Sequence, residues 1–75
     1  MNTKSSRTYL KSIEDILKNK KFKKEYRTGT IEEYELVSIK GDIISIRRVG
    51  DFVIHLWNPE NFFNFEFYVE DDYIG

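Results

Sequence analysis

The chain has 75 residues, no cysteine and a formal net charge of −1, which exclude a multidomain protein, a disulfide-braced fold and a zinc site built on cysteine. Nowhere do about 18 apolar residues follow one another, so no membrane-spanning helix is predicted. The polar first residues predict no secretory leader. We expect one small cytoplasmic domain over residues 1–75, with residues 1–5 frayed.

The charge is divided unevenly along the chain. Residues 1–27 hold nine Lys and Arg side chains against three acids, and residues 28–75 hold three against ten. A basic segment before an acidic body either steers the molecule toward an anionic partner or pairs with the body itself. Alanine and glutamine are absent whereas Lys, Ile, Asn and Phe are abundant, which is typical of a low-GC bacterium or one of its phages.

An amphipathic helix is predicted over residues 6–19, followed by a segment with two interpretations. Five apolar residues recur on one helical face: Tyr9, Leu10, Ile13, Ile16 and Leu17. Ser6 is a candidate N-cap, and Ser12 with Asp15 offers an alternative capping box. Residues 20–29 fit either an extension of this helix or a fifth strand at a sheet edge, where basic side chains would oppose aggregation.

From residue 31 onward apolar and polar residues alternate, and turn signals divide the remainder into strands. The expected strands are residues 30–40, 43–49, 52–57 and 62–69. A two-residue turn at Gly41-Asp42 would align the first two of them. It predicts three cross-strand pairs, namely Ile39–Ile44, Val37–Ile46 and Glu35–Arg48. The predicted fold is therefore α+β, with one N-terminal helix packed on an antiparallel β-meander of four or five strands.

The last two predicted strands define a core face and an opposite face. A loop at residues 58–61 would place six apolar side chains toward the helix: Phe52, Ile54, Leu56, Phe63, Phe65 and Phe67. The opposite face would carry the residues that we predict to bind a protein partner: Val53, His55, Trp57, Phe62 and Tyr68. One helix covers only one face of a sheet, and exposed aromatic residues are typical of interface hot spots. We expect self-association as a homodimer or binding of another protein.

No catalytic, metal or cofactor motif stands out. His55 is the only histidine and cannot form a catalytic triad without a nucleophile, and the acidic residues 70–72 lack the spacing of a calcium loop. We therefore predict a non-enzymatic interaction protein with no cofactor and no metal. Its size and composition are those of a small phage- or mobile-element-encoded modulator of a host protein.

A nucleic-acid-binding accessory protein is the alternative hypothesis. Six basic residues could contact phosphates: Lys18, Lys20, Lys21, Lys23, Lys24 and Arg27. The run of lysines contains no arginine for bidentate base contacts, and the acidic body would repel a duplex. The lysines could instead pair with the acidic residues of the same chain.

Overall fold

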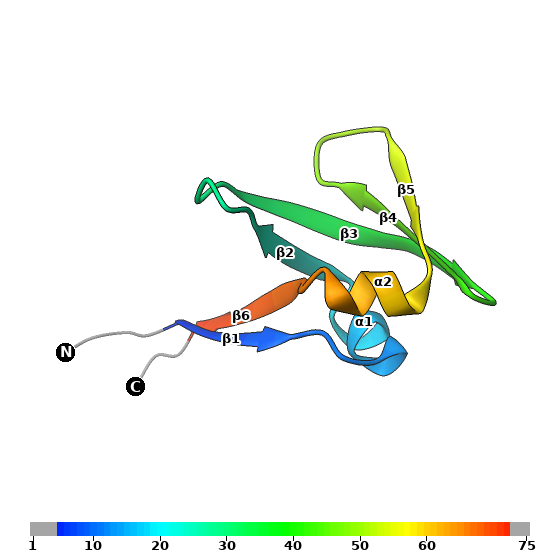
Figure 1. The fold of residues 1–75 in the computed structure, drawn as a ribbon, viewed down its shortest axis with the longest axis horizontal. Helices are drawn as coiled ribbons and strands as arrows, with labels where there is room; N and C mark the ends of the chain where they lie inside the picture. Colours follow the sequence, from blue (N-terminus) through cyan, green and yellow to red (C-terminus); the bar gives the residue numbers. More distant parts are fainter. Residues whose placement is uncertain (1–4, 73–75) are drawn as a thin grey trace.

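The computed structural model describes residues 5–72. Its six strands form one antiparallel sheet with the spatial order β1-β6-β2-β3-β4-β5 (Figure 1). The strands are β1 (Ser5–Tyr9), β2 (Lys21–Glu25), β3 (Ile31–Lys40), β4 (Ile43–Arg48), β5 (Ile54–Trp57) and β6 (Tyr68–Asp72). Two short helices are also present, α1 (Ile13–Asn19) and α2 (Pro59–Asn64). No helix in this part of the chain is long and apolar enough to cross a membrane.

This architecture corrects the predicted one. The fold is a mostly antiparallel six-stranded sheet, and the predicted N-terminal helix on a meander of four or five strands is wrong. Residues 5–9 form a strand because they pair along their whole length with β6, from Ser5–Asp72 to Tyr9–Tyr68. Pairing between the two ends of the chain overrides the local helical spacing, which carries no information about so distant a partner.

Only the second half of the predicted helix is helical. The Ser12 hydroxyl accepts a hydrogen bond from the Asp15 N–H at 3.3 Å, which confirms Ser12 as an N-cap. The Asp15 carboxylate in turn accepts the Lys11 N–H at 3.0 Å. The helix ends at Lys20, which adopts a left-handed conformation with φ 63° and donates its N–H to the Ile16 carbonyl.

Residues 20–29 contribute a strand, and this strand lies inside the sheet. β2 pairs with β3 on one side, where Phe22 stands opposite Tyr34. On its other side it meets β6 through a single residue pair, Lys23–Tyr68. The expectation of an edge strand is therefore wrong, because β6 and β1 extend the sheet beyond β2.

The hairpin of β3 and β4 follows the prediction near its turn and departs from it beyond a bulge. Ile39 pairs with Ile44 as expected. A bulge between Leu36 and Ser38 then shifts the register by one residue, giving the pairs Leu36–Ile46 and Glu35–Arg47 in place of Val37–Ile46 and Glu35–Arg48. Because of the bulge, Leu36 and Ile39 both pack against the core although they are three residues apart.

The segment predicted as the fourth strand, residues 62–69, is a helix, a turn and the start of β6. The Asn58 side chain accepts a hydrogen bond from the Asn61 N–H at 2.9 Å, and Pro59 follows it in the first turn of α2. Asparagine at the N-cap and proline just inside a helix are both strongly favoured. Glu66, with φ 67°, then turns the chain from α2 into β6.

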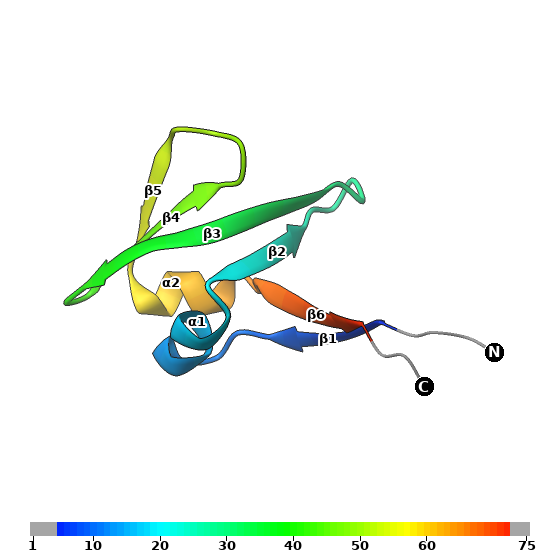
Figure 2. The ribbon, with the colours of Figure 1, turned by 180° about the vertical axis from the view of Figure 1, so that it is seen from behind.

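Buried side chains from both helices and five strands or their ends form one core: Leu10, Ile16, Phe22, Tyr34, Ile44, Ile46, Phe62 and Phe67. The sheet curves around α2 (Figure 2). Phe62 of α2 meets Phe22 of β2 and Trp57 of β5 at ring-centroid distances of 5.6 and 6.1 Å. α1 lies behind α2 in Figure 1 and in front of it in Figure 2.

The predicted core face is largely wrong. Of its six members only Phe67 is buried, while Phe63 and Phe65 are partly buried against the core. Its other three members are exposed: Phe52, Ile54 and Leu56. β5 therefore turns the opposite face to the core, with Trp57 packed edge-on against Phe67 at 5.7 Å.

Candidate interaction surfaces

β5 is the terminal strand of the sheet, and no strand of the described chain pairs with its outer side. Residues 52–58 contain no Lys, Arg, Asp or Glu. Natural edge strands are usually protected from other chains by charged residues, by proline or by a bulge. β5 has none of these within its four residues. We call residues 52–57 the β5 edge.

Apolar side chains project from the β5 edge into solvent. Phe52 exposes 90% of its surface, Leu56 67%, Val53 55% and Ile54 45%. Successive side chains of a strand point to opposite faces, so Ile54 and Leu56 lie on the outer face while Trp57 packs inward. An uncovered group of large apolar side chains on a small domain is typical of an interaction site.

A groove of about 520 Å³ lies where β5 meets the start of α2, lined by Ile54, His55, Leu56, Trp57, Asn58 and Asn61. The indole Nε1 of Trp57 is buried and has no hydrogen-bond partner. An indole N–H is a donor only, and a buried donor without an acceptor costs about 1–3 kcal/mol.

The loop that leads into β5 is held by charged groups. Arg48 donates hydrogen bonds to Glu32 at 3.1 Å and to Asp51 at 3.2 Å. The other carboxylate oxygen of Asp51 accepts the Phe52 N–H at 2.7 Å, and this bond is the main reason why the pKa of Asp51 lies below its usual value. The loop is therefore tied to β3 and β4 just before the exposed residues begin.

The five predicted partner-binding residues do not share one surface. Val53 and His55 are exposed, and the His55 ring meets the Tyr34 ring edge-on at 6.2 Å. Trp57 is half-buried, whereas Phe62 and Tyr68 expose 0% and 1% of their surface. The expectation that Phe62 and Tyr68 lack intramolecular cover therefore fails, because one belongs to α2 in the core and the other lies beneath Arg7 and beside Tyr9.

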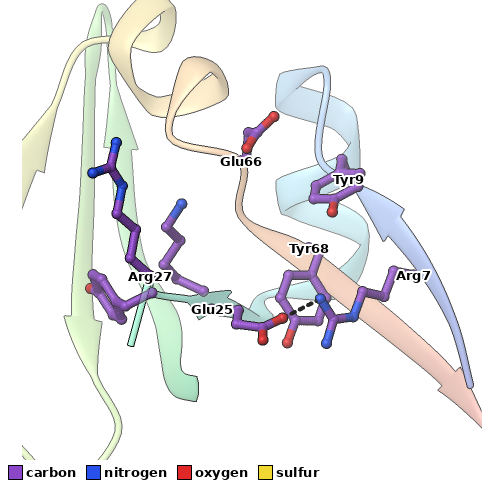
Figure 3. Close-up of a pocket in the computed structure, with 8 residues that line it drawn as sticks. Arg7, Tyr9, Glu25, Arg27, Glu66 and Tyr68 are labelled. Atoms are coloured by element: carbon purple, nitrogen blue, oxygen red, sulfur yellow. Dashed lines mark hydrogen bonds and ion pairs between the residues drawn. The ribbon is translucent and has the colours of Figure 1, made fainter. Parts of the chain in front are cut away.

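A second hollow, of about 480 Å³, opens where β6 and β1 separate from the end of β2 (Figure 3). Arg7 spans it, pairing with Glu25 at 2.5 Å and lying 4.4 Å from the centre of the Tyr68 ring. The hydrogen bond to Glu25 is the main reason why the pKa of Arg7 is raised. The Tyr68 hydroxyl is buried without a partner. The ion pair between Arg7 and Glu25 thus links β1 to β2 across this hollow.

The six basic residues of the nucleic-acid hypothesis are spread over several elements. Lys23 and Lys24 are consecutive in β2 and so point to opposite faces. Lys23 pairs with Glu70 at 3.0 Å, and Lys24 donates to the Phe65 carbonyl at 2.6 Å. The remaining four are Lys18 in the last turn of α1, Lys20 at its C-cap, Lys21 at the start of β2 and Arg27 in the turn after β2.

Within residues 5–72 no group of three His, Cys, Asp or Glu side chains is placed to hold a metal ion. Comparison with protein-family models, with curated proteins and with solved structures finds no match to this chain.

Proposed function

We propose that this chain is a non-enzymatic protein-interaction module that binds an extended polypeptide segment along β5. One observation carries the proposal: β5 is an uncharged terminal strand whose outer side has no partner among the described residues. Such a strand presents a row of backbone N–H and C=O groups that an added strand can satisfy. The exposed side chains of Phe52, Ile54 and Leu56 would pack against the added segment.

Burial of a few apolar side chains of the β5 edge would supply much of the binding free energy. Complete burial of a Phe, Leu or Ile side chain contributes about 1.5–3 kcal/mol. The three outer side chains of the β5 edge are exposed in the free chain, so most of this contribution is available on binding. Part of it is offset by the loss of translational and rotational freedom. We therefore expect charge placed at Ile54 or Leu56 to weaken binding strongly.

A cytoplasmic location and a role as a phage- or mobile-element-encoded modulator of a host protein are the biological setting that we propose. Both stay predictions from composition. Binding of nucleic acid by the basic residues stays the alternative prediction, and in that case substitution of the β5 edge would leave nucleic-acid binding intact.

The experiment compares two substitutions of equally exposed isoleucines. Ile54 on β5 is 45% exposed and Ile31 on β3 is 47% exposed, so Ile54→Lys and Ile31→Lys introduce the same charge at matched burial. The wild-type chain and both variants are immobilised, and bound proteins from a bacterial lysate, as well as bound free copies of the chain, are quantified. We expect proteins retained by the wild type and by Ile31→Lys to be lost from Ile54→Lys. Equal retention by all three, or no retention by any, would overturn the proposal.

A further inference from the structure

We infer that the segment bound at β5 is β5 of a second copy, so that two chains form a symmetric dimer with one sheet running through both. This inference rests on the proposed function and specifies its partner. Each copy contributes a six-stranded sheet that ends at β5. Antiparallel pairing of the two terminal strands would give the outer side of β5 a partner on both copies.

The residues of β5 are complementary to themselves. A two-fold axis normal to an antiparallel pair places one residue opposite its own counterpart and keeps the outer faces of both strands together. With His55 on this axis, Ile54 of each copy lies opposite Leu56 of the other. Two apolar pairs then form on the outer face, where both side chains are exposed in the single chain.

Other positions of the axis are less favourable. Centred on Leu56, the pairing would set Ile54 opposite Asn58, so only one apolar pair would form on the outer face. Centred on Ile54, it would set Ile54 opposite itself and Phe52 opposite Leu56, but Phe52 and Val53 precede the strand. His55 is thus the centre at which two apolar pairs form on the outer face with both partners inside the strand.

Charge also favours a second copy. The segment 52–58 contains no Lys, Arg, Asp or Glu, so placing it against itself brings no like charges together. The net charge of −1 adds little repulsion between whole chains. The opposite sheet edge is different in character, because β1 carries Arg7 and several hydroxyl residues. Pairing of β5 with β5 is therefore favoured over pairing of β5 with β1, which would generate open-ended chains.

The first measurement is the mass in solution, by light scattering behind size exclusion at high micromolar concentration. We expect twice the chain mass of 9.0 kDa for the wild type and for Ile31→Lys. Ile54→Lys and Leu56→Lys should raise the dissociation constant at least about tenfold. Circular dichroism confirms that each variant is folded. Trp57 is the only tryptophan and lines the groove beside β5, so its emission should change on dilution of the wild type but not of Ile54→Lys.

The second measurement locates the axis by disulfide formation, which is clean because the chain contains no cysteine. Directly opposed residues have Cα atoms about 4.5–5.5 Å apart, within the range that a disulfide spans. His55→Cys should therefore cross-link to itself on oxidation. Ile54→Cys and Leu56→Cys should each remain uncross-linked alone and should cross-link to each other when mixed.

The outcomes separate the two proposals. A dimer that is lost in Ile54→Lys and is cross-linked through position 55 supports both. A dimer that survives Ile54→Lys, or that fails to cross-link at positions 54–56, overturns the inference. A monomer that still retains lysate proteins through β5 overturns the inference and leaves the proposed function standing. A monomer with no β5-dependent binding overturns both.

Discussion

Phe62 and Phe67 stack on each other, with ring centroids 4.6 Å apart and ring planes inclined by 27°. Phe62 belongs to α2, and Phe67 immediately precedes β6, so this contact closes the turn between the two elements. Both side chains are completely buried. Phe22 meets each of them edge-on, at 5.6 and 5.2 Å. The stack thus connects the helix to the middle of the sheet.

We predict that Phe67→Ala lowers the free energy of unfolding by about 3–5 kcal/mol, because it removes a buried ring that its neighbours cannot replace. A double-mutant cycle with Phe62→Ala should give a coupling of about 0.5–1.5 kcal/mol for the stacked pair. Urea denaturation measures both quantities. Phe52→Ala is the control, since its side chain is 90% exposed and should change the stability of the monomer by less than about 0.5 kcal/mol. A loss below about 1 kcal/mol in Phe67→Ala would contradict the central place of the stack.

The sequence was sufficient to predict the elements whose partners are close in the chain. The alternation in β3 and β4 and the turn at Gly41-Asp42 predicted both strands and the pair Ile39–Ile44. β1 was not predicted, because its pairing with β6 joins opposite ends of the chain and leaves no local signal. α2 had a signal in Asn58 and Pro59, but the same residues are also common in turns.

The candidate site depends on which face β5 turns inward, and this was predicted backwards. In a strand a shift of one residue exchanges the two faces. The shift arises in the loop between β4 and β5, whose length does not specify a parity: Ile44 and Ile46 of β4 face the core as expected, and their partners in β5 are Trp57 and His55. The sequence pattern therefore places Ile54 and Leu56 in the core, whereas in the structure they form the exposed surface. Val53 and His55 are also exposed, although alternation places His55 on the same face as Trp57.

The turn between β3 and β4 offers a test of backbone conformation. Gly41 has φ +56°, in the left-handed region that L side chains rarely adopt, and a methyl group added there would meet no atom within 4 Å. The cost of Gly41→Ala is therefore conformational, and we expect it to lower the free energy of unfolding by about 1–2 kcal/mol. Gly41→Asn should cost less, because asparagine tolerates this region. Thermal unfolding distinguishes the two, and equal stability of Gly41→Ala and the wild type would contradict the assigned turn.

Tyr34 predicts a loss of stability at alkaline pH. Burial is the main cause that raises its pKa above the usual value, and its hydrogen bond with the Tyr26 hydroxyl, at 2.6 Å, is the second. The folded state thus favours protonated Tyr34. Its contribution to stability is fully present below the pKa of an unfolded tyrosine, about 10, and is lost as the pH rises above that value toward the folded pKa.

Comparison of the wild type with Tyr34→Phe isolates this contribution. The variant should be less stable near neutral pH by about 0.5–1.5 kcal/mol, because it lacks the hydrogen bond to Tyr26. Above a pH of about 10 the difference should shrink, since only the wild type has a tyrosine at this position that ionises on unfolding. Urea midpoints across this pH range measure the effect. Parallel curves for the two proteins would show that Tyr34 is not shielded in the folded state.

The junction between β6 and β2 should be the weakest line in the sheet. These strands share one residue pair, Lys23–Tyr68, whereas β1 pairs with β6 along its entire length. Backbone hydrogen bonds near such a junction open together as a local unit. We therefore expect amide hydrogen exchange to be faster in β1 and β6 than in β3 and β4.

Arg7→Ala tests which contacts keep this junction closed. Arg7 in β1 pairs with Glu25 in β2 and lies over the Tyr68 ring, so it reaches across β6. Its loss should accelerate exchange in β1 and β6 and leave β3 and β4 unchanged. Arg47→Ala is the matched control, because it removes an ion pair to Glu35 within the β3–β4 hairpin and should spare β1 and β6. If protection in β1 and β6 equals that in β3 and β4 and does not respond to Arg7→Ala, the six strands open as one unit, and the single residue pair at Lys23–Tyr68 is not a weak line.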